Sequence, residues 1–291
     1  MTRNEIQALI NLLDDPNKDV FEAVTENLVK KGTGIIPELE KAWENSDDQF
    51  HQDRLEEIIQ KIQYNHNINS FKLWIQSGYG DLLEGIYILT RFQFPDLQFS
   101  EIIKQIEKIQ KDVWIELNNN LTALEKVRIL NHIIFDIHKF SKNPDDFYNP
   151  ANSFINKVLE MKQGNPISLA IVYSVIAQRL GLPIYGVNLP RNFILAYRDE
   201  YGPHGVYDDQ TEDVLFYINP YNRGAVHSKK EIDYFLREQK IKVRKSYFIP
   251  CSNLDIIERV INNLINSYER INNPEKVKLY KKIRRELEKE E

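Results

Sequence analysis

Apolar residues recur every three or four positions along the amino-terminal part of the chain, which is the spacing of amphipathic helices. The segment "IQALINLLDDP" places Ile6, Ile10 and Leu13 on one face before it ends in an Asp-Asp-Pro turn. The same spacing continues in "DVFEAVTENLVKKG", which ends at Gly32, and in the segments "IIPELEKAWENS" and "FHQDRLEEIIQKIQ". We therefore expect four helices here, joined by short turns.

These paired helices are similar to a HEAT repeat, so residues 1–66 are expected to form a helical, HEAT-like amino-terminal region. Such helices cannot bury their apolar faces alone, and we expect this block to complete the core of the chain by packing on the remainder. A surface that binds a partner is the alternative use of the same helices.

Helical patterns continue in "YGDLLEGIYILTRFQFPDL", "FSEIIKQIEKIQKDVWIEL" and "ALEKVRILNHIIFDIHKF", and a turn-rich passage, "SKNPDDFYNPANSF", follows them. Strand patterns are confined to residues 183–221, in "PIYGVNL", "NFILAY" and "DVLFYIN". Beyond residue 250 the chain is again expected to be helical, through "NLDIIERVINNLINSYERI" and the charge-rich "PEKVKLYKKIRRELEKEE".

The segment "QGNPISLAIVYSVIAQRLGLP" predicts a helix that is buried on every side. Pro166 is well placed in its first turn, where the missing N–H would be unpaired in any residue, and Gly181 ends it. The chain then runs directly into the first strand. A buried helix whose amino end meets an antiparallel sheet is the skeleton of papain-like folds, in which the partial positive charge of the helix stabilises a thiolate.

Composition restricts the function classes. The 291 residues carry 38 basic and 43 acidic side chains, and this net charge of −5 predicts no attraction to nucleic acid or to anionic lipid. No apolar run reaches the roughly 18 residues of a membrane helix, and "MTRNEIQALI" does not read as a secretory leader. The single cysteine suits a reducing compartment, so we expect a cytoplasmic protein.

Metal and cofactor chemistry are not expected. The six histidines are scattered, and none forms a ligand pair with cysteine or glutamate at a familiar spacing. Neither of the glycine-rich nucleotide-binding strings, G-x-G-x-x-G and G-x-x-x-x-G-K-[ST], occurs in the sequence.

Three segments carry a specific likeness to a known family: "RFQFPDL", "NPANSFINKVLEMKQGNPISLAIVYSVIAQRLGLPIYGVNLPRNFILAY" and "YINPYNRG". Together they resemble the SirB1 family of the transglutaminase-like superfamily, over residues 80–270. The resemblance implies an α+β, mostly helical fold: a transglutaminase-like (papain-like) core with a small antiparallel sheet, followed by TPR-like helices. We divide the chain into residues 1–66 (HEAT-like), 67–250 (the SirB1, transglutaminase-like core) and 251–291 (a carboxy-terminal helical pair).

The enzymes of this superfamily use a cysteine that opens the buried helix, a histidine on the next strand and an acid on a later strand. By resemblance, the helix-opening position falls at Pro166, or at Asn165 if the register slips by one. The "PGHF" motif of the family reads Pro190-Arg191-Asn192-Phe193, and its "DPF" reads Asn219-Pro220-Tyr221. All three reactive groups are therefore missing, and Arg191 replaces a glycine at the rim of the cleft.

The remaining polar residues offer weak substitutes. Ser168 lies two positions beyond Pro166, about 200° around the helix, and is expected to bond the backbone at the helix start. His204 and Asp208 lie in the loop between two predicted strands, and Cys251 is remote in sequence from the cleft. The amides of Asn192 and Asn219 are expected to bond each other without charge, or merely to cap strand ends.

The leading functional hypothesis is therefore a non-catalytic, SirB1-type protein that acts as an interaction or regulatory scaffold for an unidentified protein partner. The candidate cleft comprises Asn165, Pro166, Ser168, Arg191, Asn192 and Asn219. One alternative is an acyl-transfer or amide-hydrolysing enzyme that uses displaced residues such as Ser168 and His204. Another is binding of a small molecule or peptide in the altered cleft, which calls for a pocket of at least about 300 Å³.

Overall fold

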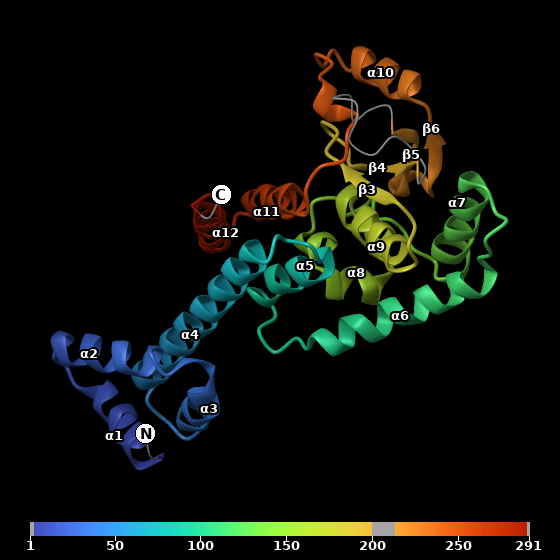
Figure 1. Cartoon of the computed structure of the whole chain (residues 1–291). Coiled ribbons are helices and arrows are strands. Elements are labelled where there is room, and N and C mark those ends of the chain that lie inside the picture. Colours follow the sequence, from blue (N-terminus) through green and yellow to red (C-terminus); the bar gives the residue numbers. More distant parts are fainter. Residues whose placement is uncertain (1–2, 200–212, 290–291) are drawn as a thin grey trace. The chain divides into compact units, whose positions relative to one another are not determined.

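A computed structural model describes residues 3–199 and 213–289 of the chain, which divides into two compact units (Figure 1). The first unit comprises Met1–Leu73 and Arg91–Pro95, and the second comprises Trp74–Thr90 and Asp96–Glu291. His204 and Asp208 lie outside the described residues.

The first unit is built from four helices: α1 (Arg3–Asn11), α2 (Lys18–Val29), α3 (Ile36–Glu44) and α4 (Gln49–Gln76). The helices expected from the amino-terminal pattern are therefore confirmed. They enclose a core of their own, made of Ile10, Leu13, Val24, Leu28, Ile35, Leu39, Leu55, Ile58 and Ile62. The four helices thus bury apolar residues against one another, and the expectation that this block also packs on the remainder of the chain stays a prediction.

One arginine closes the turn between the first two helices. The Arg54 guanidinium on α4 donates to the backbone carbonyls of Leu13 and Asp15, the latter at 3.0 Å. It also lies between two rings, 4.3 Å from the Phe21 centroid and 4.1 Å from the Phe50 centroid. The Asp-Asp-Pro turn is thus held in place by a planar cation that both stacks and donates.

Helix α4 is longer than the sequence pattern predicted. The polar stretch "YNHNINS" interrupts the apolar spacing, but the helix continues through it to Gln76. Phe71 and Trp74 are both buried near its end, so tertiary packing outweighs the modest helix propensity of the asparagines. The predicted boundary after residue 66 lies inside this helix, and the division into three regions stays a prediction.

The second unit contains the remaining helices and all the described strands. Its helices are α5 (Leu82–Arg91), α6 (Phe99–Glu116), α7 (Ala123–Asn131), α8 (Ile155–Met161), α9 (Pro166–Arg179), α10 (Lys229–Glu238), α11 (Asn253–Arg270) and α12 (Pro274–Leu287). A π-helical segment, His132–Ile137, continues α7. The three helical segments expected between residues 79 and 140, and the carboxy-terminal pair, are therefore present.

An antiparallel four-stranded sheet forms the centre of this unit, in the order β3-β4-β5-β6. Its strands are β3 (Ile184–Val187), β4 (Ile194–Arg198), β5 (Val214–Asn219) and β6 (Ala225–His227). The three predicted strands are confirmed, and β6 extends the sheet beyond the predicted limit at residue 221. A separate parallel pair joins β1 (Ser141–Lys142) to β2 (Gln163–Gly164). These short strands have no periodic signal that a sequence could reveal.

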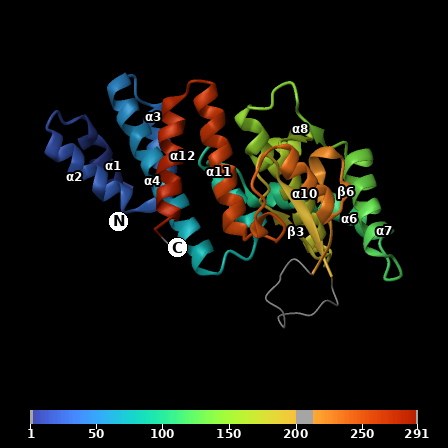
Figure 2. The same cartoon turned by 90° about the horizontal axis from the view of Figure 1, so that it is seen from above.

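Two helices cover the opposite faces of the sheet (Figures 1 and 2). On one face lies α9, every residue of which from Ile167 to Ala177 is buried, as predicted. On the other face, Ile232 and Leu236 of α10 pack against Ile194 and Tyr217 of the sheet. The fold is therefore α+β and mostly helical, with helical regions at both ends of the chain. The amino end of α9 faces the approach to β4, and there the candidate site lies.

Candidate functional site

The amino end of α9 is closed by reciprocal hydrogen bonds between its cap residue and its first turn. Asn165 Oδ1 accepts from the Ser168 backbone N–H at 3.0 Å, and the Ser168 hydroxyl oxygen accepts from the Asn165 backbone N–H at 3.0 Å. Asn165 Nδ2 also donates to Ser153 Oγ at 2.9 Å. A Cβ atom at Gly164 would lie 2.4 Å from Ser168 Oγ, so this close packing requires glycine. Asn165 and Ser168 are thus engaged in shaping the helix start.

The turn before β4 has an unusual backbone. Arg191 adopts φ +62°, in the left-handed region that glycine favours, and its guanidinium donates to Gln239 Oε1 at 3.1 Å. A glycine would adopt this conformation without strain, whereas an arginine adopts it at a cost. Asn192 donates its backbone N–H to the carbonyl of Leu189 at 3.2 Å, while its Oδ1 accepts from the Phe193 backbone N–H at 2.9 Å.

A cavity of about 180 Å³, here called the α9 cleft, lies where these two segments meet α11. It is lined by Phe147, Tyr148, Asn165, Pro166, Ile167, Arg191, Asn192, Phe193, Arg259, Asn263, Asn266 and Ser267. Four of the six residues proposed from the sequence therefore come together: Asn165, Pro166, Arg191 and Asn192. The volume is smaller than the roughly 300 Å³ expected of a small-molecule pocket.

Asn219 and Ser168 do not line the α9 cleft. Asn219 ends β5, lies opposite Ala225 of β6, and has a buried Oδ1 that accepts no hydrogen bond from any described residue. Since Asn192 Oδ1 accepts from the adjacent backbone, the structure shows no hydrogen bond between these two described amides. The expected Asn192–Asn219 pair is thus replaced by local bonding at Asn192, which caps the start of β4.

The charges of the α9 cleft are all of one sign. Arg191 and Arg259 line it, and among the described residues no carboxylate, imidazole or thiol does. Arg259 Nη1 donates to Asn188 Oδ1 at 2.8 Å, and burial lowers the pKa of the Arg259 guanidinium. Four neutral amides, Tyr148 and Ser267 supply the remaining polar groups. The cleft therefore offers hydrogen bonds and positive charge, and none of its described lining residues accepts a proton near neutral pH.

Cys251 lies outside the lining of the α9 cleft. Desolvation, with a smaller contribution from Asp255, raises the pKa of the Cys251 thiol to about 12. Its backbone N–H donates to the carbonyl of Gly186 at 2.8 Å, which ties the start of α11 to β3. A thiol with so high a pKa holds almost no thiolate at neutral pH, so it lacks the form that attacks an acyl carbon.

Sequence reasoning missed the contribution of α11 to the α9 cleft. Arg259, Asn263, Asn266 and Ser267 follow the spacing i, i+4, i+7 and i+8, so they form one polar stripe beside the apolar face of that helix. This stripe was the available signal. Phe147 and Tyr148 were also missed, because the turn-rich passage that contains them has no periodicity.

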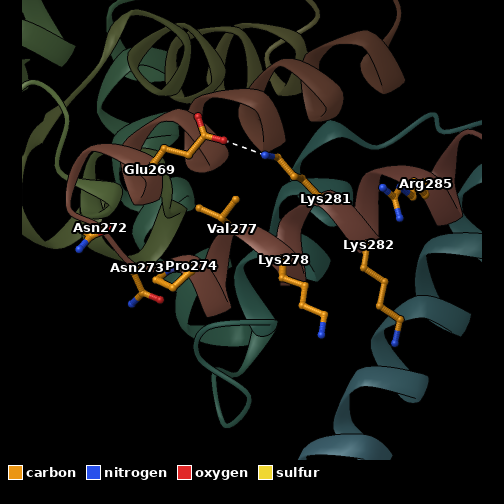
Figure 3. Close-up of a pocket in the computed structure, with 9 residues that line it drawn as sticks. All are labelled: Glu269, Asn272, Asn273, Pro274, Val277, Lys278, Lys281, Lys282 and Arg285. Atoms are coloured by element: carbon orange, nitrogen blue, oxygen red, sulfur yellow. Dashed lines mark hydrogen bonds and ion pairs between the residues drawn. The ribbon is translucent and has the colours of Figure 1, made fainter.

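A second hollow, here called the α12 groove, lies at the carboxy-terminal helical pair and has a volume of about 500 Å³. It is lined by Glu269, Asn272, Asn273, Pro274, Val277, Lys278, Lys281, Lys282 and Arg285 (Figure 3). Lys281 reaches toward Glu269 and pairs with it at 2.8 Å, whereas Lys278 and Lys282 extend in another direction. Four cations and one carboxylate make this groove strongly basic.

Two further properties concern only the described ranges, 3–199 and 213–289. No group of three histidine, cysteine, aspartate or glutamate side chains there is arranged to hold a metal ion. No helix there is both long and apolar enough to cross a bilayer.

Comparison with known proteins shows that most of the α9 cleft lies within a recognised family region. A sequence model of the transglutaminase-like superfamily matches residues 100–262, which contain the α9 cleft up to Arg259. No solved structure matches the chain.

Curated relatives occur in bacteria and in mammals. A UPF0162 protein of Xylella fastidiosa strain 9a5c is 24% identical over 197 residues, which cover 66% of each chain. One of Vibrio cholerae is 21% identical over 62% of this chain and 63% of the relative. F-box only protein 21 of Mus musculus is 25% identical over 72% of this chain. The match spans just under two thirds of the bacterial proteins and 36% of the mouse protein.

Proposed function

This chain belongs to the transglutaminase-like superfamily, and we propose that it is a SirB1-type member that works as a non-catalytic protein-interaction module. The observation that carries the proposal is the lining of the α9 cleft. By resemblance, the superfamily enzymes hold a thiol and an imidazole at two positions that are Pro166 and Asn192 here, and both of these residues line the α9 cleft. Neither side chain attacks an acyl carbon or transfers a proton near neutral pH.

The nearest reactive groups do not replace the missing ones. The Ser168 hydroxyl is buried, accepts from the Asn165 N–H and donates to the Asn165 carbonyl at 3.2 Å. Cys251 is protonated at neutral pH, as its raised pKa indicates. Loss of the core members of a catalytic triad lowers the rate by roughly 10⁴–10⁶-fold. Acid–base or nucleophilic catalysis at the α9 cleft would therefore need residues from beyond the described ranges, such as His204.

The α12 groove supports an interaction role. Lys278, Lys281, Lys282 and Arg285 follow the spacing i, i+3, i+4 and i+7, so they form a cationic row along two turns of one helix. The net charge of the whole chain is −5, so the charge of this row is opposite in sign to that of the chain as a whole. Pro274 and Val277 add apolar contact surface beside it. Such a groove fits an acidic segment of a protein partner.

Two measurements on the full chain test this function. Hydrolysis of a p-nitrophenyl ester and deamidation of a glutamine-containing peptide should proceed at the rate seen in buffer alone. Affinity capture from lysate should recover a partner that is lost in the charge reversal Lys278→Glu/Arg285→Glu. The matched control, Lys104→Glu/Lys111→Glu, reverses two exposed cations of α6 at the same seven-residue spacing and should retain the partner. Turnover above buffer without a captured partner would overturn the proposal.

A further inference from the structure

The Arg259 side chain is a half-buried cation that no carboxylate within residues 3–199 and 213–289 neutralises. The only hydrogen-bond partner that the described structure gives its guanidinium is Asn188 Oδ1, at 2.8 Å, and no carboxylate of the described residues pairs with it. A guanidinium carries five N–H donors, so several of them are free to bond water or a ligand. Removing a cation from water is unfavourable unless an opposite charge compensates for the lost hydration. A bound anion would supply that compensation.

The surroundings of Arg259 in the α9 cleft also favour an anion. Arg191 adds a second guanidinium at the exposed rim, and its hydrogen bond to the neutral amide of Gln239 leaves its charge uncompensated by that partner. On the stripe that begins with Arg259, Asn263 and Asn266 present amide N–H donors of the kind that hold carboxylate oxygens. The lining therefore combines two planar cations with neutral donors.

The size and the walls of the α9 cleft indicate which anion fits. About 180 Å³ accommodates a side chain or a chain end rather than a cofactor. One wall is aromatic: Phe147 and Tyr148 meet edge to face at 5.1 Å, and the Arg270 guanidinium lies 3.6 Å from the Tyr148 centroid. An aromatic wall suits the methylene groups that carry a side-chain carboxylate, and a guanidinium matches a carboxylate with two parallel hydrogen bonds.

We propose that the α9 cleft binds a glutamate or aspartate side chain of a protein partner, with its carboxylate held by Arg259 and steered by Arg191. The inference rests on the proposed interaction function and names the chemistry of one contact within it. On this proposal, the position at which the superfamily enzymes attack an acyl carbon instead binds the carboxylate of an acidic residue, and no reaction follows.

A titration of the full chain tests this inference. N-acetyl-L-glutamate N-methylamide, its neutral glutamine counterpart and inorganic phosphate are each added while the Arg259 Nε–H resonance is followed by NMR. We expect a saturable shift with the glutamate probe and a much weaker one with the glutamine probe. Arg259→Gln should weaken binding about tenfold to hundredfold, the range for a charge-assisted hydrogen bond. Arg191→Gln should weaken it about twofold to fivefold, as expected of an exposed ion pair.

The matched control is Arg128→Gln, which removes an exposed arginine of α7 that lines neither the α9 cleft nor the α12 groove and should leave binding unchanged. For Arg259→Gln, binding is monitored through the backbone resonances, and an unchanged melting temperature shows that the fold is intact. If that variant unfolds, the loss in Arg191→Gln decides. Equal binding of the two amino-acid probes, tighter binding of phosphate, an equal loss in Arg128→Gln or no saturable shift would each overturn the inference.

The outcome is separable from that of the proposed function. Probe binding together with turnover of the ester would end the non-catalytic interpretation and leave the carboxylate site in place. Absence of probe binding, with capture still dependent on the α12 groove, would overturn the carboxylate site alone.

Discussion

Single residues decide the chemistry of the α9 cleft, and sequence alone located several of them. Asn165, Pro166, Arg191 and Asn192 were placed in one cleft by resemblance, and all four line the observed cavity. The sequence also placed Asn219 in this cleft. Only its pairing with Ala225 of β6 shows that it lies elsewhere, at the end of β5. Arg259 was missed because only the apolar spacing along α11 was considered. The polar residues on the other side of the same helix were not.

The backbone at Arg191 yields a prediction at the scale of one residue. Because φ is +62°, Arg191→Gly should leave the protein about 1 kcal/mol more stable than Arg191→Ala, although both variants lose the same guanidinium. Urea unfolding of the two variants measures the difference. The control is the exposed Arg244, whose φ is −130°, where alanine should instead be more stable than glycine by about 0.5–1 kcal/mol. If the glycine and alanine variants had the same order of stability at Arg191 and at Arg244, the proposed backbone strain at Arg191 would be contradicted.

At the scale of elements, the apolar pattern predicted helices and the central strands well. It predicted the buried α9 because every side of that helix is apolar, and it predicted β3, β4 and β5 from dense β-branched and aromatic residues. It failed where an element is too short to be periodic, as in β1, β2 and β6, and where packing overrides polarity, as in α4. Those failures arise from contacts distant in sequence, which no local window contains.

One contact between elements has no tolerance for an added atom. Asn131, the last residue of α7, donates from Nδ2 to the Gly224 carbonyl at 3.0 Å and accepts from the Tyr173 hydroxyl of α9 at 3.0 Å. A Cβ atom at Gly224 would lie 1.8 Å from Asn131 Oδ1, and Gly224 also has φ +73°.

Gly224→Ala should therefore lower the free energy of unfolding by about 3 kcal/mol, since it combines overpacking with backbone strain and breaks the junction. Chemical denaturation of the full chain provides the measurement. Gly34→Ala is the control, because nothing lies within 4 Å of its added Cβ atom and its φ is not positive. If Gly224→Ala lowered the free energy of unfolding by less than about 1 kcal/mol, the prediction would be contradicted, because Asn131 would then move aside at little cost.

At the scale of the whole molecule, buried tyrosine and cysteine side chains with raised pKa values make the stability of the second unit decrease at alkaline pH. Burial raises the pKa of Tyr217 to about 12 and that of Tyr268 to about 12, from an ordinary value of 10. Cys251 rises to about 12 from 9. Each group is neutral when protonated, and the folded state holds its proton more tightly than the unfolded state does. The stabilisation is complete below the ordinary pKa and disappears as pH rises through the folded-state pKa.

We therefore expect the free energy of unfolding to be level up to about pH 9 and to fall steadily between pH 9 and pH 12. Urea unfolding at intervals of one pH unit measures the slope. Tyr217→Phe removes one titrating group, together with its hydrogen bond to the Phe248 carbonyl at 2.8 Å. That variant should be less stable at pH 8 but should have a shallower decline above pH 10. A slope that is unchanged by the substitution would exclude a contribution from Tyr217.

The single cysteine, Cys251, also allows opening of the junction between α11 and β3 to be measured. Its thiol is held protonated where α11 joins β3, so a thiol-specific reagent at pH 8 will modify Cys251 slowly as long as that junction is closed. Whenever the junction opens, the thiol regains its ordinary acidity and is labelled. The labelling rate therefore reports the frequency with which the α11 wall of the α9 cleft detaches, without any engineered probe.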